Sequence, residues 1–167
     1  GGVTFSGGEP LLHGDFIIEV AKILKKHSIH TAIDTAGVGV GNYEHILKYI
    51  DLIILDIKHT TLDGFKKVTR VSTNEYEKFI EVANKLNKKF WIRQVIVPGI
   101  MDNDEYLLSL KEYIKKINNI ERIEFLPYHK LGREKYIKLG IPYHAENICE
   151  MDKDECEKLY NKFIKML

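Results

Sequence analysis

The chain has 167 residues, with 25 lysines and arginines against 24 aspartates and glutamates, which leaves a formal net charge of +1 at pH 7. This balance, with the charges scattered along the chain, gives no electrostatic reason to expect a nucleic acid or an anionic membrane as a partner. The content of 44% hydrophobic and 29% charged residues is typical of a globular protein, and we expect a single domain over residues 1–167.

Two further classes of protein are disfavoured. The apolar run Leu52–Leu55 is interrupted at Asp56, and no comparable run reaches the length of a membrane span. Cys149 and Cys156 are the two cysteines of the chain, and their spacing fits neither a zinc motif nor a disulfide framework. We therefore expect reduced thiols in a cytoplasmic protein.

Apolar, strand-like runs alternate with segments of helical periodicity along the chain. The predicted strands are Val3–Ser6, Thr31–Asp34, Leu52–Lys58, Phe90–Val97 and Ile120–Pro127. The predicted helices are approximately Asp15–Lys26, Tyr43–Tyr49, Glu75–Asn87, Asp104–Ile117 and Asp152–Met166. Such alternation predicts an α/β fold in which a parallel sheet is built from right-handed βαβ units.

Each predicted strand ends in polar residues. In order, these residues are Ser6 and Glu9, Asp34 and Thr35, Asp56 and Lys58, Arg93, and His129. Ligands of parallel α/β sheets and barrels bind at the carboxyl ends of the strands, because the loops that follow the strands meet there. Five polar strand ends in succession indicate one binding site to which every strand contributes.

The first strand leads into the segment Gly7-Gly8-Glu9-Pro10. Glycines allow a ligand to approach the backbone closely, so the backbone carbonyls and Glu9 are candidates to receive a cationic amine. A tight strand-to-helix turn with an acid at the helix start is the alternative interpretation. Because the sequence begins within an element and without Met, we expect it to be a piece of a longer protein.

The second and third strands end in acids. The segment Asp34–Gly37 has the composition of an ordinary Asx turn, although Asp34 also lies at the expected site. Strand alternation places Asp56 and Lys58 on one face, where buried charges are costly unless they are paired or liganded. They form either a structural ion pair or a carboxylate-binding lysine beside an acid that holds a cation or substrate. Lys58 is also a candidate for Schiff-base chemistry.

The last two strands contribute one basic residue each. Arg93 stands among apolar residues, and its guanidinium suits a carboxylate, a phosphate or peptide carbonyls; pairing with Asp56 or with a helix acid is the alternative. His129 is a candidate base or hydrogen-bond donor to a sugar hydroxyl, with a satisfied loop histidine as the alternative. The remaining six histidines lack ligand spacing and are expected to have no site role; these are His13, His27, His30, His45, His59 and His144.

Taken together, these motifs resemble the pyruvate formate-lyase activating enzymes, the glycyl-radical-enzyme activases of the radical S-adenosylmethionine (SAM) superfamily. The segments that carry the resemblance are Gly1–Pro10, Asp34–Gly37, Leu55–Lys58, Trp91–Gly99 and Leu126–Gly132. The resemblance implies a partial, TIM-like (β/α)6 barrel, of which this chain holds about five βα units. It also implies reductive cleavage of SAM at a 4Fe–4S cluster to a 5′-deoxyadenosyl radical. That radical would abstract hydrogen from a glycine of pyruvate formate-lyase or a related enzyme, with a flavodoxin or ferredoxin as electron donor.

The resemblance also implies roles for particular positions. The residues expected to bind SAM are Ser6, Gly7, Gly8, Glu9, Asp34, Lys58 and His129, with the glycine segment at the methionine amine and His129 at the ribose. A monovalent cation is implied at Asp34, Thr35 and Asp56, where it would offset neighbouring carboxylates. Arg93 matches a residue that faces the glycine-loop peptide of the partner. Catalytic roles are thus expected for Lys58, Arg93 and His129.

The chain departs from the family pattern in three places. Ala36 stands where the family more often has Asn, and Arg70-Val71-Ser72 replaces a Gly-Val-Ser turn. The C-x3-C-x2-C segment that holds the cluster in the family does not occur in these 167 residues. We therefore expect the cluster loop and the first strand upstream, and expect this chain alone to be inactive. Two alternatives remain open: a Schiff-base lyase that uses Lys58, and a cluster-free module that binds a nucleoside or a peptide.

Overall fold

The computed structural model describes residues 1–70, 73–143 and 145–167. Val71, Ser72 and His144 lie outside the described residues, and with them most of the Arg70–Ser72 segment. The chain forms two compact units. The first comprises Gly1–Gln94 and Tyr113–Glu124, and the second comprises Val95–Glu112 and Phe125–Leu167. That one domain spans residues 1–167 stays a prediction.

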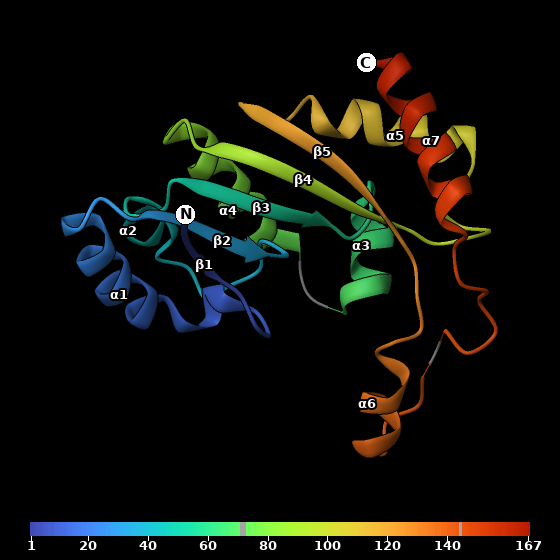
Figure 1. Ribbon diagram of the computed structural model, residues 1–167, viewed down its shortest axis with the longest axis horizontal. Helices are drawn as coiled ribbons and strands as arrows, with labels where there is room; N and C mark the ends of the chain where they lie inside the picture. Colours follow the sequence, from blue (N-terminus) through green and yellow to red (C-terminus); the bar gives the residue numbers. More distant parts are fainter. Residues whose placement is uncertain (71–72, 144) are drawn as a thin grey trace. The chain divides into compact units, whose positions relative to one another are not determined.

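The strands form one sheet whose order follows the sequence, β1-β2-β3-β4-β5 (Figure 1). Their bounds are β1 Gly2–Phe5, β2 His30–Thr35, β3 Leu52–Ile57, β4 Lys89–Ile96 and β5 Ile120–Pro127. The pairings of β1 with β2, β2 with β3 and β3 with β4 are parallel. The predicted α/β class is confirmed, and each predicted strand is found within a residue or two of its expected bounds. The carboxyl ends of β1–β4 consequently meet at one edge of the sheet.

The helices of the first unit connect these strands. They are the 3-10 helix η1 Pro10–His13, α1 Gly14–Lys26, α2 Tyr43–Leu47, α3 Leu62–Thr69 and α4 Thr73–Lys85. The last helices are α5 Asp104–Ile114, which begins in the second unit and ends in the first, and α6 Arg133–Lys138 and α7 Lys153–Met166 in the second. Helix α4 ends before Asn87, whose φ of 53° is left-handed, which explains why the predicted helix extended too far.

Two short helices, α3 and α6, were missed by the sequence analysis, and the helical turn η1, which begins at the predicted strand-to-helix turn, lies before the predicted start at Asp15. For α3 a signal was present, because the Thr61 hydroxyl caps the helix by accepting a hydrogen bond from Gly64 N at 3.1 Å. Gly64 within the first turn weakens the helical pattern and so conceals the helix. Helix α6 has only six residues, too few for a periodic signal.

The core of the first unit lies between the helices and one face of the sheet. On β3, Leu55 and Ile57 are buried, whereas Ile54 and Asp56 on the other face are only partly covered. Tyr43 of α2 packs edge-on against Phe79 of α4, with ring centroids 5.4 Å apart. This burial pattern leaves one face of the sheet for apolar packing and directs the charged residues of β2, β3 and β4 to the other.

The second unit has an aromatic cluster of its own. The ring centroid of Phe125 lies 5.7 Å from that of Tyr160 and 5.2 Å from that of Phe163, and both of these residues are on α7. Helix α7 is capped by Asp152, whose carboxylate accepts hydrogen bonds from two backbone amides of the first turn. Within the described part of the chain, none of the helices has the length and apolar character needed to cross a membrane.

Candidate functional site

A pocket of about 320 Å³ opens at the carboxyl ends of β1, β2, β3 and β4. Its lining comprises Ser6, Gly7, Gly8, Glu9, Asp34, Thr35, Ala36, Asp56, Lys58 and Arg93. Every predicted site residue that belongs to the first unit therefore lines one cavity. Ala36, which the sequence analysis noted only as a departure, lines it too, so the absent Asn side chain concerns the pocket itself.

The loop after β1 contributes backbone to the pocket. Gly7 has a φ of 114°, which side-chain-bearing residues rarely adopt, and Gly7 and Gly8 are both exposed. Pro10 begins η1, and the Glu9 carboxylate caps that helix by accepting a hydrogen bond from Leu11 N at 3.1 Å. The predicted turn with an acid at a helix start is thus present, and it leaves the backbone of both glycines accessible to a ligand.

Glu9 also links this loop to the end of β2. Its Oε1 accepts a hydrogen bond from the Thr35 hydroxyl at 2.5 Å, and its Oε2 accepts one from Ala36 N at 2.9 Å. The Thr35 oxygen in turn accepts a hydrogen bond from Gly37 N at 2.8 Å. The carboxylate is therefore directed toward the protein as well as toward the pocket.

Four charged side chains at the ends of β2, β3 and β4 are linked by ion pairs. Arg93 Nε donates to Asp56 Oδ1 at 2.9 Å, and Arg93 Nη2 donates to Asp34 Oδ1 in a short contact. Lys58 Nζ donates to Asp56 Oδ2 at 3.2 Å. The side chains of Arg93, Asp34 and Asp56 are each 23% exposed, and that of Lys58 is 33% exposed. The ion pairs that the sequence analysis weighed as alternatives are present in the structure.

The electrostatics of the pocket follow from these contacts. Burial opposes the charge on Arg93, but the hydrogen bonds and negative charges of Asp56 and Asp34 outweigh it, so the pKa of Arg93 is raised. Three carboxylates, on Glu9, Asp34 and Asp56, face two cations, on Lys58 and Arg93, which leaves the lining with one net negative charge. The pocket therefore suits a ligand that carries a net positive charge together with an anionic group.

Residues 1–114 match the sequence family described as the radical SAM superfamily. The chain is 48% identical over 167 residues to a pyruvate formate-lyase-activating enzyme of Clostridium pasteurianum, covering 100% of this chain and 70% of that protein. It is 41% identical over 167 residues to the enzyme of the same name from Staphylococcus epidermidis, covering 96% of this chain and 66% of that protein. This chain belongs to the pyruvate formate-lyase-activating enzymes of the radical SAM superfamily. It spans about two thirds of the length of these curated relatives.

The fold agrees with this assignment. A solved domain of the pyruvate-formate lyase-activating enzyme from Bacteroides vulgatus superposes with a TM-score of 0.75 at 21% identity, covering 99% of this chain and 94% of that one. The expected fold, a partial radical SAM barrel in which parallel strands alternate with helices, is thereby confirmed. The roles of individual residues in the pocket stay predictions.

The family implies two cofactors, SAM and a 4Fe–4S cluster, and the residues of the pocket fit SAM. SAM carries an aminium, a sulfonium and a carboxylate, and the pocket offers backbone carbonyls, carboxylates and Lys58 for these groups. The residues do not fit a 4Fe–4S cluster, which needs thiolate ligands. Cys149 is exposed and Cys156 is buried, both are free thiols of the second unit, and burial raises the pKa of Cys156.

The monovalent cation expected at Asp34, Thr35 and Asp56 stays a prediction. In the structure Arg93 bridges Asp34 and Asp56, so a side chain already places a positive charge between two of the three expected ligands. The hydroxyl of Thr35, the third expected ligand, contacts Glu9 and Gly37 N. Across residues 1–70, 73–143 and 145–167, no group of three or more His, Cys, Asp or Glu side chains is placed to hold a metal ion.

His129 belongs to the second unit. It is exposed after β5, and its Nδ1 accepts a hydrogen bond from Leu131 N at 3.3 Å. This local contact orients the ring within its own loop. Contact of His129 with a ribose stays a prediction.

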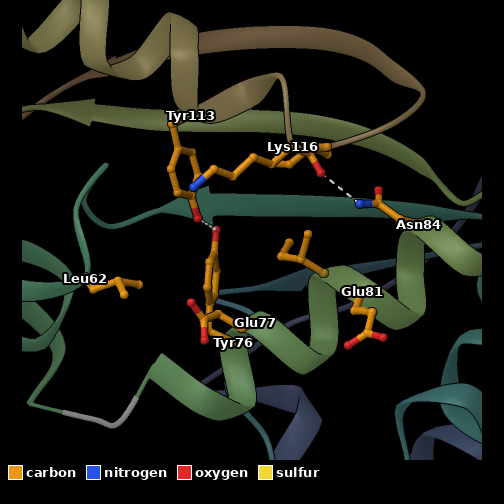
Figure 2. Close-up of a pocket in the computed structure, with 9 residues that line it drawn as sticks. Leu62, Tyr76, Glu77, Glu81, Asn84, Tyr113 and Lys116 are labelled. Atoms are coloured by element: carbon orange, nitrogen blue, oxygen red, sulfur yellow. Dashed lines mark hydrogen bonds between the residues drawn. The ribbon is translucent and has the colours of Figure 1, made fainter.

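A second cavity of the first unit, of about 380 Å³, lies between α4 and the segment that follows α5 (Figure 2). The hydroxyl of Tyr113 donates to that of Tyr76 at 2.6 Å, and Asn84 donates to the carbonyl of Lys116 at 2.8 Å. Lys116 Nζ lies 5.6 Å from the centroid of the Tyr113 ring. Because Tyr76 and Tyr113, and Asn84 and Lys116, bond to each other and none of the predicted site residues lines this cavity, it is a weaker candidate for the site.

Proposed function

We propose that the protein activates pyruvate formate-lyase or a related glycyl radical enzyme by abstracting hydrogen from one glycine, using SAM cleaved at a 4Fe–4S cluster. The observation that carries the proposal is the pocket at the strand ends, whose lining has one net negative charge from three carboxylates and two cations. SAM has one net positive charge, from a sulfonium and an aminium against one carboxylate. The names of the relatives support pyruvate formate-lyase as the partner.

Within the proposal, the chain binds and orients SAM. The backbone carbonyls of Gly7 and Gly8 would receive the aminium, and Lys58 would hold the carboxylate. Asp34 would bind close to the ribose and carboxylate, at a position fixed by its ion pair with Arg93. The cluster, held by residues outside this chain, would supply the electron for reductive cleavage of SAM, and methionine and 5′-deoxyadenosine would be the products.

The cluster ligands and the partners complete the proposal. Three cysteines outside these 167 residues would hold the cluster, so this chain alone would be inactive. A flavodoxin or ferredoxin would donate the electron, and the free thiols Cys149 and Cys156 agree with a cytoplasmic setting. Because Arg93 is paired with Asp34 and Asp56, its contribution to binding the glycine loop would be made from that paired position.

The contact made by Lys58 is unfavourable for the Schiff-base alternative. Lys58 Nζ contacts Asp56 Oδ2 at 3.2 Å, so the amine would have to leave this contact before it could attack a carbonyl carbon. Borohydride trapping of a carbonyl compound on Lys58 would support the lyase, and tight SAM binding without iron would support the cluster-free module.

The experiment that tests the proposal uses the full-length protein, reconstituted anaerobically with iron and sulfide and then reduced. We expect 5′-deoxyadenosine to form from SAM, and we expect Lys58→Ala to lower its yield. Lys85→Ala is the matched control, because Lys85 lies on the surface of α4 in an exposed pair with Glu44 at 3.8 Å. A protein that holds its cluster and yet fails to cleave SAM would overturn the proposal.

A further inference from the structure

We propose that Glu9 is a positioning residue, which holds the Gly7-Gly8 loop at the end of β2 through Thr35, while the loop backbone makes the contact with the SAM amine. This inference rests on the proposed function. It assigns to Glu9 and Thr35 a shared task, which differs from the separate roles of amine ligand and cation ligand that the sequence analysis expected.

The carboxylate oxygens of Glu9 are hydrogen-bonded mainly to the protein itself. An ionised carboxylate has about four lone-pair positions. Leu11 N and the Thr35 hydroxyl both donate to Oε1, at 3.1 and 2.5 Å, and Ala36 N donates to Oε2 at 2.9 Å. Three of the positions are therefore filled from within the protein. At most one lone-pair position, on Oε2, remains to accept a hydrogen bond from a ligand.

Side-chain packing does not hold the Gly7-Gly8 loop in place. A Cβ added at Gly7 or at Gly8 would meet no atom within 4 Å, so neighbouring side chains do not confine this stretch. Glu9 is the next residue, and its carboxylate makes hydrogen bonds to the Thr35 side chain and the Ala36 backbone of a different strand end. The position of the glycine carbonyls relative to Asp34 thus depends on this link.

Thr35 is buried and takes part in two hydrogen bonds. Thr35 is only 3% exposed. Its hydroxyl donates a hydrogen bond to Glu9 and accepts one from Gly37 N at 2.8 Å. A hydrogen bond to a charged acceptor that is shielded from water is strong and directional. Thr35 therefore connects the loop after β1 with the turn after β2.

The test is a double-mutant cycle on the dissociation constant of SAM, measured by calorimetry on the full-length, cluster-loaded protein without reductant. We expect Thr35→Val to weaken SAM binding about tenfold, as the loss of a hydrogen bond to a charged group does. Thr35→Ser keeps the hydroxyl and should restore binding. In the background of Glu9→Gln, adding Thr35→Val should have little further effect, because the two side chains act through one link.

Thr31→Val is the matched control. Thr31 is 1% exposed and lies near the opposite end of β2, where its hydroxyl donates to Tyr49 O at 2.7 Å. Its substitution should lower stability without changing SAM binding. Equal losses of binding in Thr31→Val and Thr35→Val would overturn the inference, because a general loss of stability would then explain both. Normal binding in Thr35→Val together with weak binding in Glu9→Gln would do so as well, because Glu9 would then be a direct ligand.

A second measurement separates this inference from the proposed function. Amide hydrogen exchange of the protein without SAM should be faster at Leu11 and Ala36 in Glu9→Gln, and faster at Gly37 in Thr35→Val, than in the parent. If the parent failed to bind SAM, the proposed function would fall, and these rates would still show whether Glu9 holds the loop. Unchanged rates in both variants would overturn the positioning role. Repeating the binding measurement in potassium and in choline buffer tests whether Thr35 acts through a bound cation instead.

Discussion

Asp56 and Arg93 lie directly opposite each other in the register of β3 and β4, and the distance from Arg93 Nε to Asp56 Oδ1 is 2.9 Å. The same guanidinium reaches Asp34 on β2, so one side chain connects the carboxyl ends of three neighbouring strands. Cross-strand pairs on one face are the units that stabilise a sheet. The residues that line the pocket thus also hold its wall together.

Removal of Arg93 should therefore reduce stability. Arg93→Ala leaves Asp34 and Asp56 without their shared cation, and loss of hydrogen bonds to charged groups should lower the free energy of unfolding by about 1–3 kcal/mol. Arg122→Ala is the control, because its pair with Glu124 at 2.8 Å is exposed and worth less than about 1 kcal/mol. Urea unfolding measures the free energy of unfolding of both variants. Equal losses would show that the partly buried pairs of Arg93 stabilise the sheet no more than an exposed pair does.

The same substitution should change how the site responds to salt. In the parent, Arg93 supplies the positive charge between Asp34 and Asp56, so SAM binding should be nearly the same in sodium, potassium and choline buffers at equal ionic strength. In Arg93→Ala, binding should come to depend on the small cation, because two carboxylates then lie unneutralised beside the ligand carboxylate. A strong cation dependence in the parent would instead favour the cation site expected from the sequence.

Gly37 should tolerate no side chain. Its φ is +76°, and an added Cβ would lie 2.9 Å from Tyr76 Cδ2, whereas Gly41 has a φ of +90° with nothing within 4 Å. Both alanine variants should lose about 1–2 kcal/mol from backbone strain. Gly37→Ala should lose roughly 1–3 kcal/mol more from the clash, and should also weaken SAM binding by displacing the turn after Thr35. Chemical unfolding of the two variants provides the comparison, and similar losses would show that the Tyr76 ring gives way.

Stability should fall at alkaline pH for a specific reason. Burial, with a hydrogen bond to Glu75, raises the pKa of Tyr43 to about 12, and burial raises the pKa of Tyr113 to about 12. An unfolded tyrosine titrates near about pH 10, so the native state holds these two phenols neutral over a range in which the unfolded state loses its protons. The stability due to both groups is therefore present below about pH 10 and is lost as the pH rises toward about 12.

Phenolate absorbance and urea unfolding, both followed against pH, test this prediction. Tyr43→Phe and Tyr113→Phe should each remove part of the absorbance change that appears late in the titration, and should make unfolding less sensitive to alkali. Loss of the early part of the absorbance change in either variant would show that its phenol is not shielded in the native state.

The sequence predicted more of the fold than of the local contacts. Strand alternation placed Asp56 and Lys58 on one face, and the structure has them there, because the side-chain period of a strand is a property of the chain itself. Helices α3 and α6 were missed because short helices depend more on caps and tertiary packing than on a periodic pattern. The start of α3 had one signal in the sequence, the helix-capping residue Thr61.

By itself, the sequence determined the order of strands and helices, the polar residues at the strand ends and the motifs that assign the family, since all of these follow from local residue patterns. Only the tertiary structure decided which partner each charged group takes. For Arg93 an ion pair and a ligand role were equal alternatives in the sequence, and the register of β3 and β4 places Asp56 opposite it. For Glu9, a candidate amine ligand, folding brings the Thr35 hydroxyl within 2.5 Å of the carboxylate. The physical reason is that pairing between strands depends on residues that are distant in the chain, and only the packed sheet brings them within hydrogen-bonding distance.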